Sequence, residues 1–208
     1  MAAFALLAFG ACKDDGNGNG GGAPAQSTGA EVDASDKSWH YYSLERNTEV
    51  GTGEESAGVN AQWFARADWD VALSGYKVRT NSGEATTAGS QGGVYTFSER
   101  CDRNGADAGA QAFYETVTAV PPGAEFVADK TYTDAGMSGT DVLVRSEASV
   151  IRFLLKEDGS KVMPPCYMQS PVYIFRSADG QKHYKLVFTQ YKDADGVSGK
   201  VRFHFARV

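Results

Sequence analysis

Residues 67–97, with the sequence ADWDVALSGYKVRTNSGEATTAGSQGGVYTF, decide the fold class. The stretch opens with a period-two pattern in which Trp69, Val71 and Leu73 alternate with small or polar residues, as in a β-strand. A run rich in glycine, serine and threonine follows, and residues 94–97 then resume the strand pattern. Because a glycine-rich connection of this length costs conformational entropy, such a loop usually carries binding function or stays disordered.

The remaining chain shows similar chemistry, with short segments rich in β-branched and aromatic residues separated by turn residues. We expect strands at residues 39–44, 112–117, 142–145, 172–176, 183–191 and 200–207, and residues 150–155 form a further apolar run. In the last of these, Val201, Phe203 and Phe205 share one face, which should pack against a core. Residues 146–156 fit a buried strand and a helix equally well, and no other amphipathic helix of three turns is evident. The predicted fold is therefore all-β, a single domain of antiparallel strands and hairpins with little helix.

Composition and charge narrow the class of function. The chain has 208 residues, of which 42% are hydrophobic and 12% aromatic, enough for one sizeable core. The formal charge of −6, from 20 basic and 26 acidic residues without a basic cluster, argues against a nucleic-acid partner. No Walker-type phosphate loop, G-x-S-x-G elbow or H-E-x-x-H zinc motif occurs in the sequence. We therefore do not expect an enzyme.

The N-terminus has the pattern of a bacterial lipoprotein signal peptide. Residues 1–11, MAAFALLAFGA, are apolar, too short to span a bilayer, and end in small residues directly before Cys12. The pattern implies cleavage before Cys12 and lipidation of that residue, so the protein would meet the membrane through a lipid anchor only. An ordinary signal peptide or a buried N-terminal segment is the alternative. Residues 12–35 then read as a lipidated cysteine and a flexible linker, and residues 36–208 as the folded domain.

Two further cysteines, Cys101 and Cys166, form the candidate disulfide. An exported protein meets an oxidising environment in which such a pair can bridge, and only one pairing is available. The sequence leaves open whether the two residues approach each other. Metal binding is the weaker interpretation, since neither cysteine has a second ligand at the usual spacing.

The histidines and one pair of aspartates are the remaining polar candidates. His183 and His204 lie at positions typical of surface histidines, and His40 fits a partly buried, hydrogen-bonded side chain. Asp68 and Asp70 flank a tryptophan and could bind calcium only with more oxygen ligands than the sequence offers nearby. Hydrogen bonding to the backbone is the favoured role for both aspartates.

The methionines stand outside the apolar runs in which core residues belong. Met137 lies in a run of glycine and serine, Met163 directly precedes two prolines, and Met168 follows shortly after. A methionine in such a segment has little to pack on locally, so it either covers the core as a lid or points toward a ligand. Periodicity alone favours the lid.

The order of motifs along the chain resembles the HmuY family of haem-binding lipoproteins from Bacteroidetes. The motifs are WHYYSL at 39–44, WDVAL at 69–73, YKVRTNSG at 76–83, SQGGVY at 90–95, VMPPCY at 162–167 and VYIFRSADGQKHYKLVFTQY at 172–191. The lysine and paired acids after Cys12 are similar to a surface-export signal of lipoproteins in the same phylum. The resemblance covers nearly the whole chain from Cys12 onward and leaves residues 69–97 as framework and family signature.

The resemblance implies a haemophore that binds haem b non-covalently. Such a protein captures haem from host or environmental haemoproteins and passes it to an outer-membrane haem transporter. It would be lipid-anchored in the outer membrane and face the cell surface, with release from the cell as a further option. The family's axial iron ligands match Met137 and Met163, with Met168 as the fallback second ligand. A surface β-domain for adhesion or glycan binding, in which these methionines only pack, is the competing hypothesis.

Overall fold

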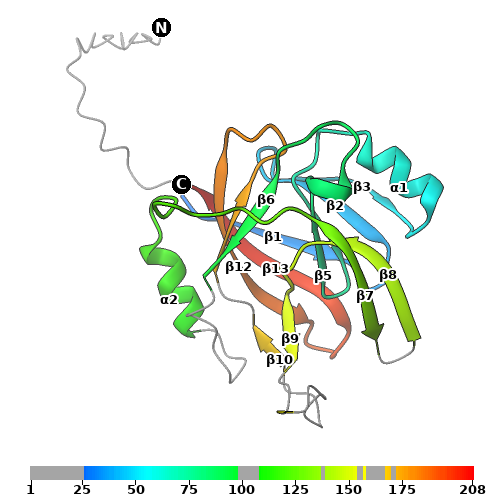
Figure 1. Cartoon of the computed structure of the whole chain (residues 1–208). Coiled ribbons are helices and arrows are strands. Elements are labelled where there is room, and N and C mark those ends of the chain that lie inside the picture. The colour runs from blue at the N-terminus through cyan, green and yellow to red at the C-terminus, as the bar shows by residue number, and fades with distance from the viewer. Residues whose placement is uncertain (1–25, 98–107, 137–138, 154–156, 158–166, 170–171) are drawn as a thin grey trace, which may run out of the picture.

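Strands dominate the structure, a computed structural model that describes residues 26–97, 108–136, 139–153, 157, 167–169 and 172–208 (Figure 1). The strands pair in an antiparallel manner and form two larger sheets and two hairpins. The prediction of an all-β fold with little helix is confirmed.

The first large sheet has five strands in the order β1-β13-β12-β11-β6. Its strands are β1 (Thr28–Asp33), β6 (Gly93–Thr96), β11 (Tyr173–Arg176), β12 (His183–Lys192) and β13 (Ser198–Arg207). Along β13, Val201, Phe203 and Phe205 are buried on one face, as the period-two pattern predicts. Arg202, from the other face, is exposed.

The second large sheet has four strands in the order β3-β2-β4-β5. Its strands are β2 (Trp39–Ser43), β3 (Thr48–Gly53), β4 (Val71–Ser74) and β5 (Lys77–Thr80). One face packs on the five-stranded sheet, where Tyr42 meets Phe203 with ring centroids 5.5 Å apart. The other face carries a cluster in which Tyr41 stacks on Trp63 at 4.0 Å. Because both faces are covered, every residue of β4 is buried, the small and polar ones included.

Two short helices lie within the described residues. Helix α1 (Ala57–Phe64) begins at Ser56, whose side chain accepts a hydrogen bond from the Val59 backbone, and contributes Trp63 to the second cluster. Helix α2 (Ala108–Thr116) packs on the five-stranded sheet, on the face opposite the main core. The expected strand at 112–117 is therefore wrong. Ala110, Tyr114 and Val117 are buried at helical spacing, which the strand assignment overlooked.

Ordered structure begins before the predicted domain boundary. Strand β1 lies inside the stretch 12–35 that we expected to be a flexible linker, and it pairs with β13 along its whole length. Val32 and Ala34 are buried in the main core. The low apolar content of this stretch was misleading, because an edge strand gains much of its stability from backbone pairing with a neighbour.

The glycine-rich loop predicted between the two strand patterns of residues 67–97 is largely structured. Part of it is strand β5, and a short 3₁₀ helix, η1 (Gly83–Ala85), follows. Beyond η1, the backbone amides of Thr87 and Ala88 both donate to the carbonyl of Phe64, at 2.7 and 3.1 Å. The stretch is thus framework, as the family resemblance indicates.

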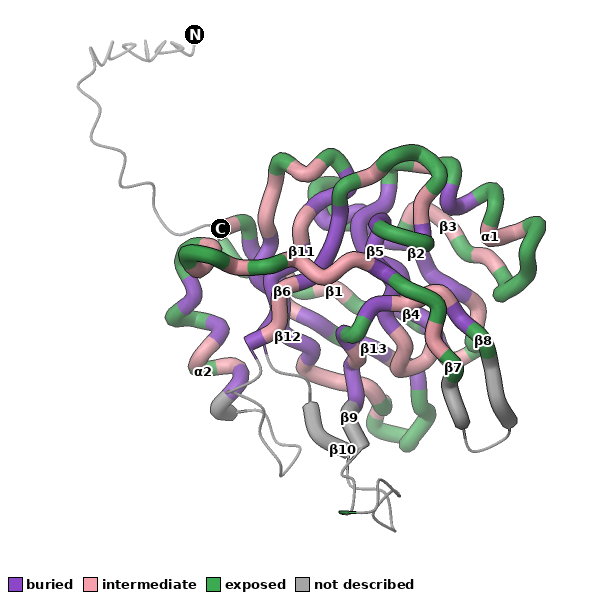
Figure 2. Tube along the Cα trace, viewed as in Figure 1, coloured by how far each residue is buried: buried purple, intermediate pink, exposed green. Residues whose placement is uncertain are grey.

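Two hairpins extend from the sheets toward the lower edge of the molecule in Figure 1. One consists of β7 (Lys130–Gly136) and β8 (Gly139–Arg145), and the other of β9 (Ile151–Phe153) and β10 (Tyr167–Gln169). Within the described part of the ambiguous stretch 146–156, residues 151–153 form strand β9 and residues 146–150 form an irregular connection. In Figure 2 the buried residues gather in the sheets, and most of the described part of the β7–β8 hairpin is exposed or intermediate.

Candidate functional site

The two hairpins share a common root on the edge of β5. Residues 146–150 connect β8 to β9 and run along that edge. The amide of Ser146 donates to the carbonyl of Val78 at 3.0 Å, and the amide of Val150 donates to that of Tyr76 at 3.1 Å. The end of β8 and the start of β9 are therefore held at fixed positions on one strand.

The connecting segment is also tied to the five-stranded sheet. The hydroxyl of Tyr173 on β11 donates to the carbonyl of Ser149 at 2.9 Å, and Ala148 and Val150 are buried in the main core. Both large sheets therefore fix the origin of both hairpins, and neither hairpin can shift its root without disrupting the core.

A buried carboxylate anchors the start of β7. The side chain of Asp129, the residue before β7, accepts the amide of Thr80 at 3.1 Å and the hydroxyls of Thr80 and Ser82. Its carbonyl accepts the amide of Glu84 at 3.0 Å. Burial raises the pKa of Asp129 to about 7, while its hydrogen bonds with Thr80 act in the opposite direction. Gly83, at φ 50°, allows this close approach, since a Cβ there would lie 2.2 Å from the Asp129 carbonyl oxygen.

A buried arginine anchors β8 on its other side. Arg79 Nε donates to the carbonyl of Val144 at 2.7 Å, and another guanidinium nitrogen lies 2.8 Å from Glu55. The guanidinium stacks 3.8 Å from the ring of Trp39 and donates to the hydroxyl of Tyr41. The polar groups of this arginine are thus satisfied within the fold, and we assign it a structural role.

One face of the β7–β8 hairpin combines apolar and cationic side chains. Lys130 pairs with Arg145, and Tyr132 pairs with Leu143 two positions further along the ladder. The Arg145 guanidinium lies 4.5 Å from the Tyr132 ring, and Leu143 is buried outside the three main hydrophobic clusters. On the opposite face Val142 is 66% exposed, an unusual environment for a large apolar side chain in this fold.

The predicted iron ligands Met137 and Met163 lie outside the described residues. In the sequence, Met137 stands between Gly136 and Gly139, the last paired residues of the β7–β8 ladder. Met163 falls between the two strands of the other hairpin, β9 and β10.

Of the other predicted site residues, only one has a described backbone. Met168 lies in β10, with its Cα paired to that of Arg152 on β9. The lipidation residue Cys12 and the candidate disulfide partners Cys101 and Cys166 lie outside the described residues. The disulfide and the lipid anchor stay predictions.

The histidines have structural environments. His40 is buried and lies 3.0 Å from Asp36 and 3.2 Å from Glu49, as expected of a hydrogen-bonded histidine. Burial lowers the pKa of His183, and its ring lies 5.1 Å from that of Phe126. Within the part of the chain that the structure describes, no three acidic, histidine or cysteine side chains form a cluster suited to a metal ion.

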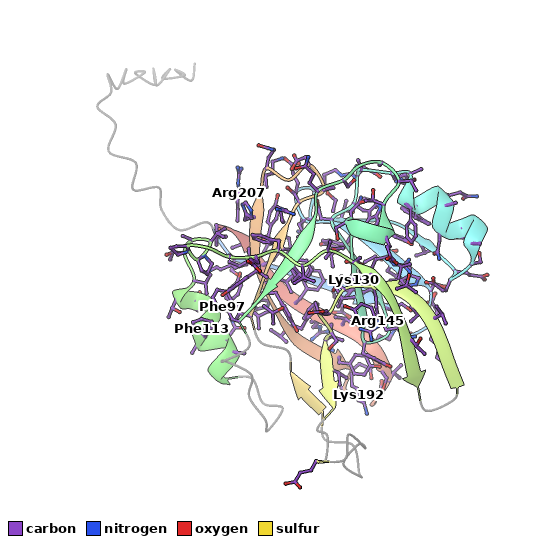
Figure 3. All side chains as sticks on the ribbon, in the orientation of Figure 1. Phe97, Phe113, Lys130, Arg145, Lys192 and Arg207 are labelled. Carbon is purple, nitrogen blue, oxygen red and sulfur yellow. The ribbon has the colours of Figure 1, made fainter. Side chains whose placement is uncertain are left out.

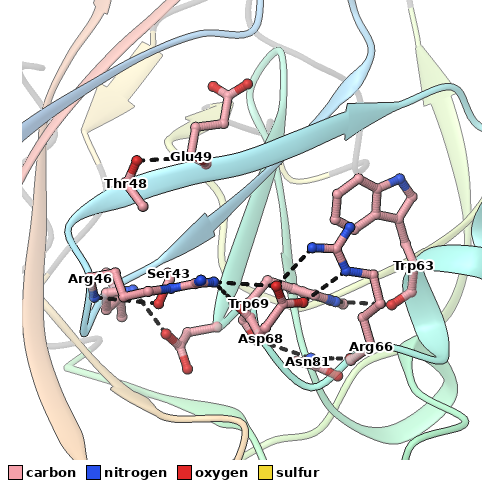
Figure 4. Close-up of polar contacts among 11 residues, drawn as sticks. Ser43, Arg46, Thr48, Glu49, Trp63, Arg66, Asp68, Trp69 and Asn81 are labelled. Carbon is pink, nitrogen blue, oxygen red and sulfur yellow. Dashed lines mark hydrogen bonds and ion pairs between the residues drawn. The ribbon is translucent and has the colours of Figure 1, made fainter.

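The predicted backbone role of Asp70 is confirmed. Its carboxylate accepts the amides of Leu44 at 2.8 Å and Ala178 at 3.0 Å, which links the two large sheets. Asp68 instead forms ion pairs with Arg46 and Arg66 (Figure 4). Its carbonyl also accepts a hydrogen bond from Arg46 at 2.7 Å. Both carboxylates are occupied by protein groups.

Comparison with known proteins decides the family. The HmuY protein family matches residues 35–205 of this sequence. The chain belongs to the HmuY family. No curated protein matches the chain.

Solved structures share the HmuY fold with this chain. A protein of Bacteroides vulgatus named as HmuY-like and haem-binding is 20% identical, with a TM-score of 0.51 over 86% of this chain and 91% of its own. A protein of Bacteroides fragilis named as a lipoprotein is 20% identical, with a TM-score of 0.51 over 86% and 88% of the two chains. The apo HmuY analogue of Tannerella forsythia is 16% identical, with a TM-score of 0.50 over 89% and 97%.

Proposed function

We propose that this HmuY-family chain is a haemophore, which captures haem b non-covalently and passes it to an outer-membrane haem transporter. Membership of the family carries the proposal, because the match spans the domain from residue 35 to residue 205. The name of the Bacteroides vulgatus relative, which includes haem binding, supports it. The role is binding and transfer rather than catalysis.

Met137 and Met163 are the proposed axial ligands of the haem iron, with Met168 as the fallback second ligand. In sequence, each of the first two falls between the paired strands of one hairpin, and the two hairpins share one root on β5. Two ligands carried on hairpins with a fixed origin could hold a planar group between them. Thioether sulfur is a soft ligand, so the site should prefer ferrous over ferric haem.

The described residues near the hairpins suit the other parts of a haem molecule. The macrocycle is apolar, and the half-buried ring of Tyr132 offers apolar surface on one face of β7–β8. The propionates are carboxylates, and the same face carries Lys130 and Arg145. The sequence has no C-x-x-C-H motif for covalent attachment, in keeping with a carrier that releases its cargo.

The protein is proposed to act at the cell surface. Cleavage of residues 1–11 would leave Cys12 as a lipidated N-terminus in the outer membrane. The relative named as a lipoprotein supports this location. None of the helices in the described residues is long and apolar enough to cross a bilayer. Haem donors would be host or environmental haemoproteins, and release from the cell remains a further option of the proposal.

Absorption spectroscopy of the purified protein with added haem tests the function. We expect a shifted Soret band, strongest after reduction with dithionite, and weaker binding by Met137→Ala and Met163→Ala. Met168→Ala should bind as the unaltered protein does. Absence of a spectral change in both redox states would overturn the haem proposal and favour adhesion or glycan binding. Unchanged binding by the double methionine variant would overturn only the ligand assignment.

A further inference from the structure

We infer that Arg145 and Lys130 form the carboxylate-binding end of the haem site and hold the propionates. The inference rests on the proposed function and assigns a role to residues that sequence patterns did not single out. Figure 3 labels both residues, which belong to neighbouring strands at the root of the β7–β8 hairpin.

The two cations are directly opposite each other in the ladder. Lys130 is the first residue of β7 and Arg145 the last of β8, and their Cα atoms are partners. Like charges at directly opposed positions repel each other and destabilise a hairpin. An anion bound between them would turn this repulsion into attraction, so the arrangement favours a ligand with one or more carboxylates.

Arg145 lacks an acidic partner among the described residues. Its guanidinium donates to the carbonyl of Ser146 at 3.3 Å and stacks on Tyr132, and its Nε is buried without a hydrogen-bond partner. The nearest acid along the chain, Glu147, accepts instead from the Tyr132 hydroxyl at 3.2 Å. A buried donor without a partner costs free energy in the empty protein, which a bound carboxylate would recover.

Two strand cations of the five-stranded sheet are neutralised by facing acids. Lys200 pairs with Asp33 and Arg202 with Glu31 across the β1–β13 ladder, and the latter pair is 2.6 Å long. In a chain with 26 acidic and 20 basic residues, partners for a cation are plentiful. Arg176 and Lys185 also lack an ion pair in the described part of the chain and donate to carbonyl oxygens instead. Lys130 and Arg145 differ from them in being directly opposed in one ladder, and this juxtaposition marks a candidate anion site.

Lys130 and Arg145 stand at one end of the β7–β8 ladder, and in sequence the proposed iron ligand Met137 follows its other end. This order is the one expected if the propionates and the iron of one haem are bound along the same hairpin. Six residue steps separate Arg145 from Gly139, the last paired residue of β8, or about 20 Å at the rise of an antiparallel strand. Leu143 and Tyr132 lie between the two ends.

Comparing the affinity for haem with that for haem dimethyl ester, which has no free carboxylates, distinguishes this role from a structural one. We expect the unaltered protein to bind haem about 10-fold or more tightly than the ester, since hydrogen bonds to charged groups contribute that much. Arg145→Gln should lose this preference, with weaker haem binding and unchanged ester binding. Lys130→Gln should lose part of it, and Arg145→Lys should retain part of it. The Soret maximum should stay the same, because iron ligation is intact.

Arg202→Gln is the matched control, as it removes one strand cation from the five-stranded sheet. It should keep the full preference for haem, and thermal melting of each variant would report any loss of folding. If Arg145→Gln prefers haem over the ester as strongly as the unaltered protein does, the inference is wrong, but the proposal of haem binding stands. Failure of the unaltered protein to bind either porphyrin would overturn the proposed function together with the inference.

Discussion

Asp129 shows how one residue joins stability to the geometry of the candidate site. Its carboxylate and backbone hold together β5, η1 and the start of β7. The carboxylate sits almost fully out of water, so its charged form is stabilised only by hydrogen bonds from Thr80 and Ser82 and by the nearby charge of Arg79. Protonation of the Asp129 carboxylate should therefore change the stability of the hairpin root.

Replacing Asp129 by asparagine should change the pH dependence of stability. The pKa is about 7 in the fold and near 3.8 in the unfolded chain, so between these values the folded state holds a proton that the unfolded state has lost. Stability from this group is thus greatest at low pH and falls as the pH rises to about 7, by up to about 4 kcal/mol. Urea unfolding at pH 5 and pH 8 should show this loss in the unaltered protein and a smaller loss in Asp129→Asn. Parallel curves of unfolding free energy against pH for the two proteins would contradict the assigned pKa.

His183 contributes to the same pH range with the opposite sign, because its pKa is lowered in the fold. Its contribution is present in both proteins and therefore cancels in the comparison.

Gly83→Ala should destabilise the same root strongly. A Cβ at this position would lie 2.2 Å from the Asp129 carbonyl oxygen, and φ is 50°. We expect a loss of about 2–4 kcal/mol in urea unfolding, from backbone strain and displacement of Asp129. Gly58→Ala, in α1 with nothing within 4 Å of the added atom, is the control and should be neutral or stabilising by about 0.5–1 kcal/mol. Similar losses in both variants would refute the steric argument.

At the scale of elements, the two large sheets hold the main core and the two hairpins extend from them. Strands β11, β12 and β13 carry much of the main core, whereas β7–β8 and β9–β10 are two-stranded and depend on their common root. The proposed ligand residues Met137 and Met163 fall in sequence between the strands of these hairpins, whose origin is fixed in the core.

Strand β1 is predicted to be essential although it precedes the region that matches the family. A chain that starts at residue 36 lacks β1 and leaves the edge of β13 unpaired. We expect it to melt at lower temperature than a chain that starts at residue 26 and to aggregate through the exposed edge. Thermal melting and light scattering compare the two. Equal melting temperatures would show that residues 28–33 are a dispensable linker, as composition alone suggested.

At the scale of the whole molecule, haem binding should couple the two hairpins. Backbone amides of β7–β8 are expected to exchange with deuterium faster than those of β12–β13 in the apo protein, because a two-stranded ladder opens locally. Haem held by ligands from both hairpins should slow exchange in β7–β8 and β9–β10 together and leave the central sheet unchanged. Mass spectrometry of deuterated peptides measures this. Protection of one hairpin alone would contradict ligation from both.

Local periodicity and the order of motifs were enough to predict the fold class, most strands and the family. It predicted the buried face of β13 and the backbone role of Asp70. It could not place α2, because a short helix with few apolar residues also fits a strand, nor β1, whose stability comes from a partner far along the chain.

The architecture of the candidate site became evident from the folded structure alone. The common root of the two hairpins, the buried Asp129 and the facing cations Lys130 and Arg145 depend on residues far apart in sequence. No local pattern marks such residues, because their burial and charge environment arise only when β5 and β8 meet. The methionine ligands were inferred from family resemblance, and the described hairpins supply the support on which that hypothesis can now be tested.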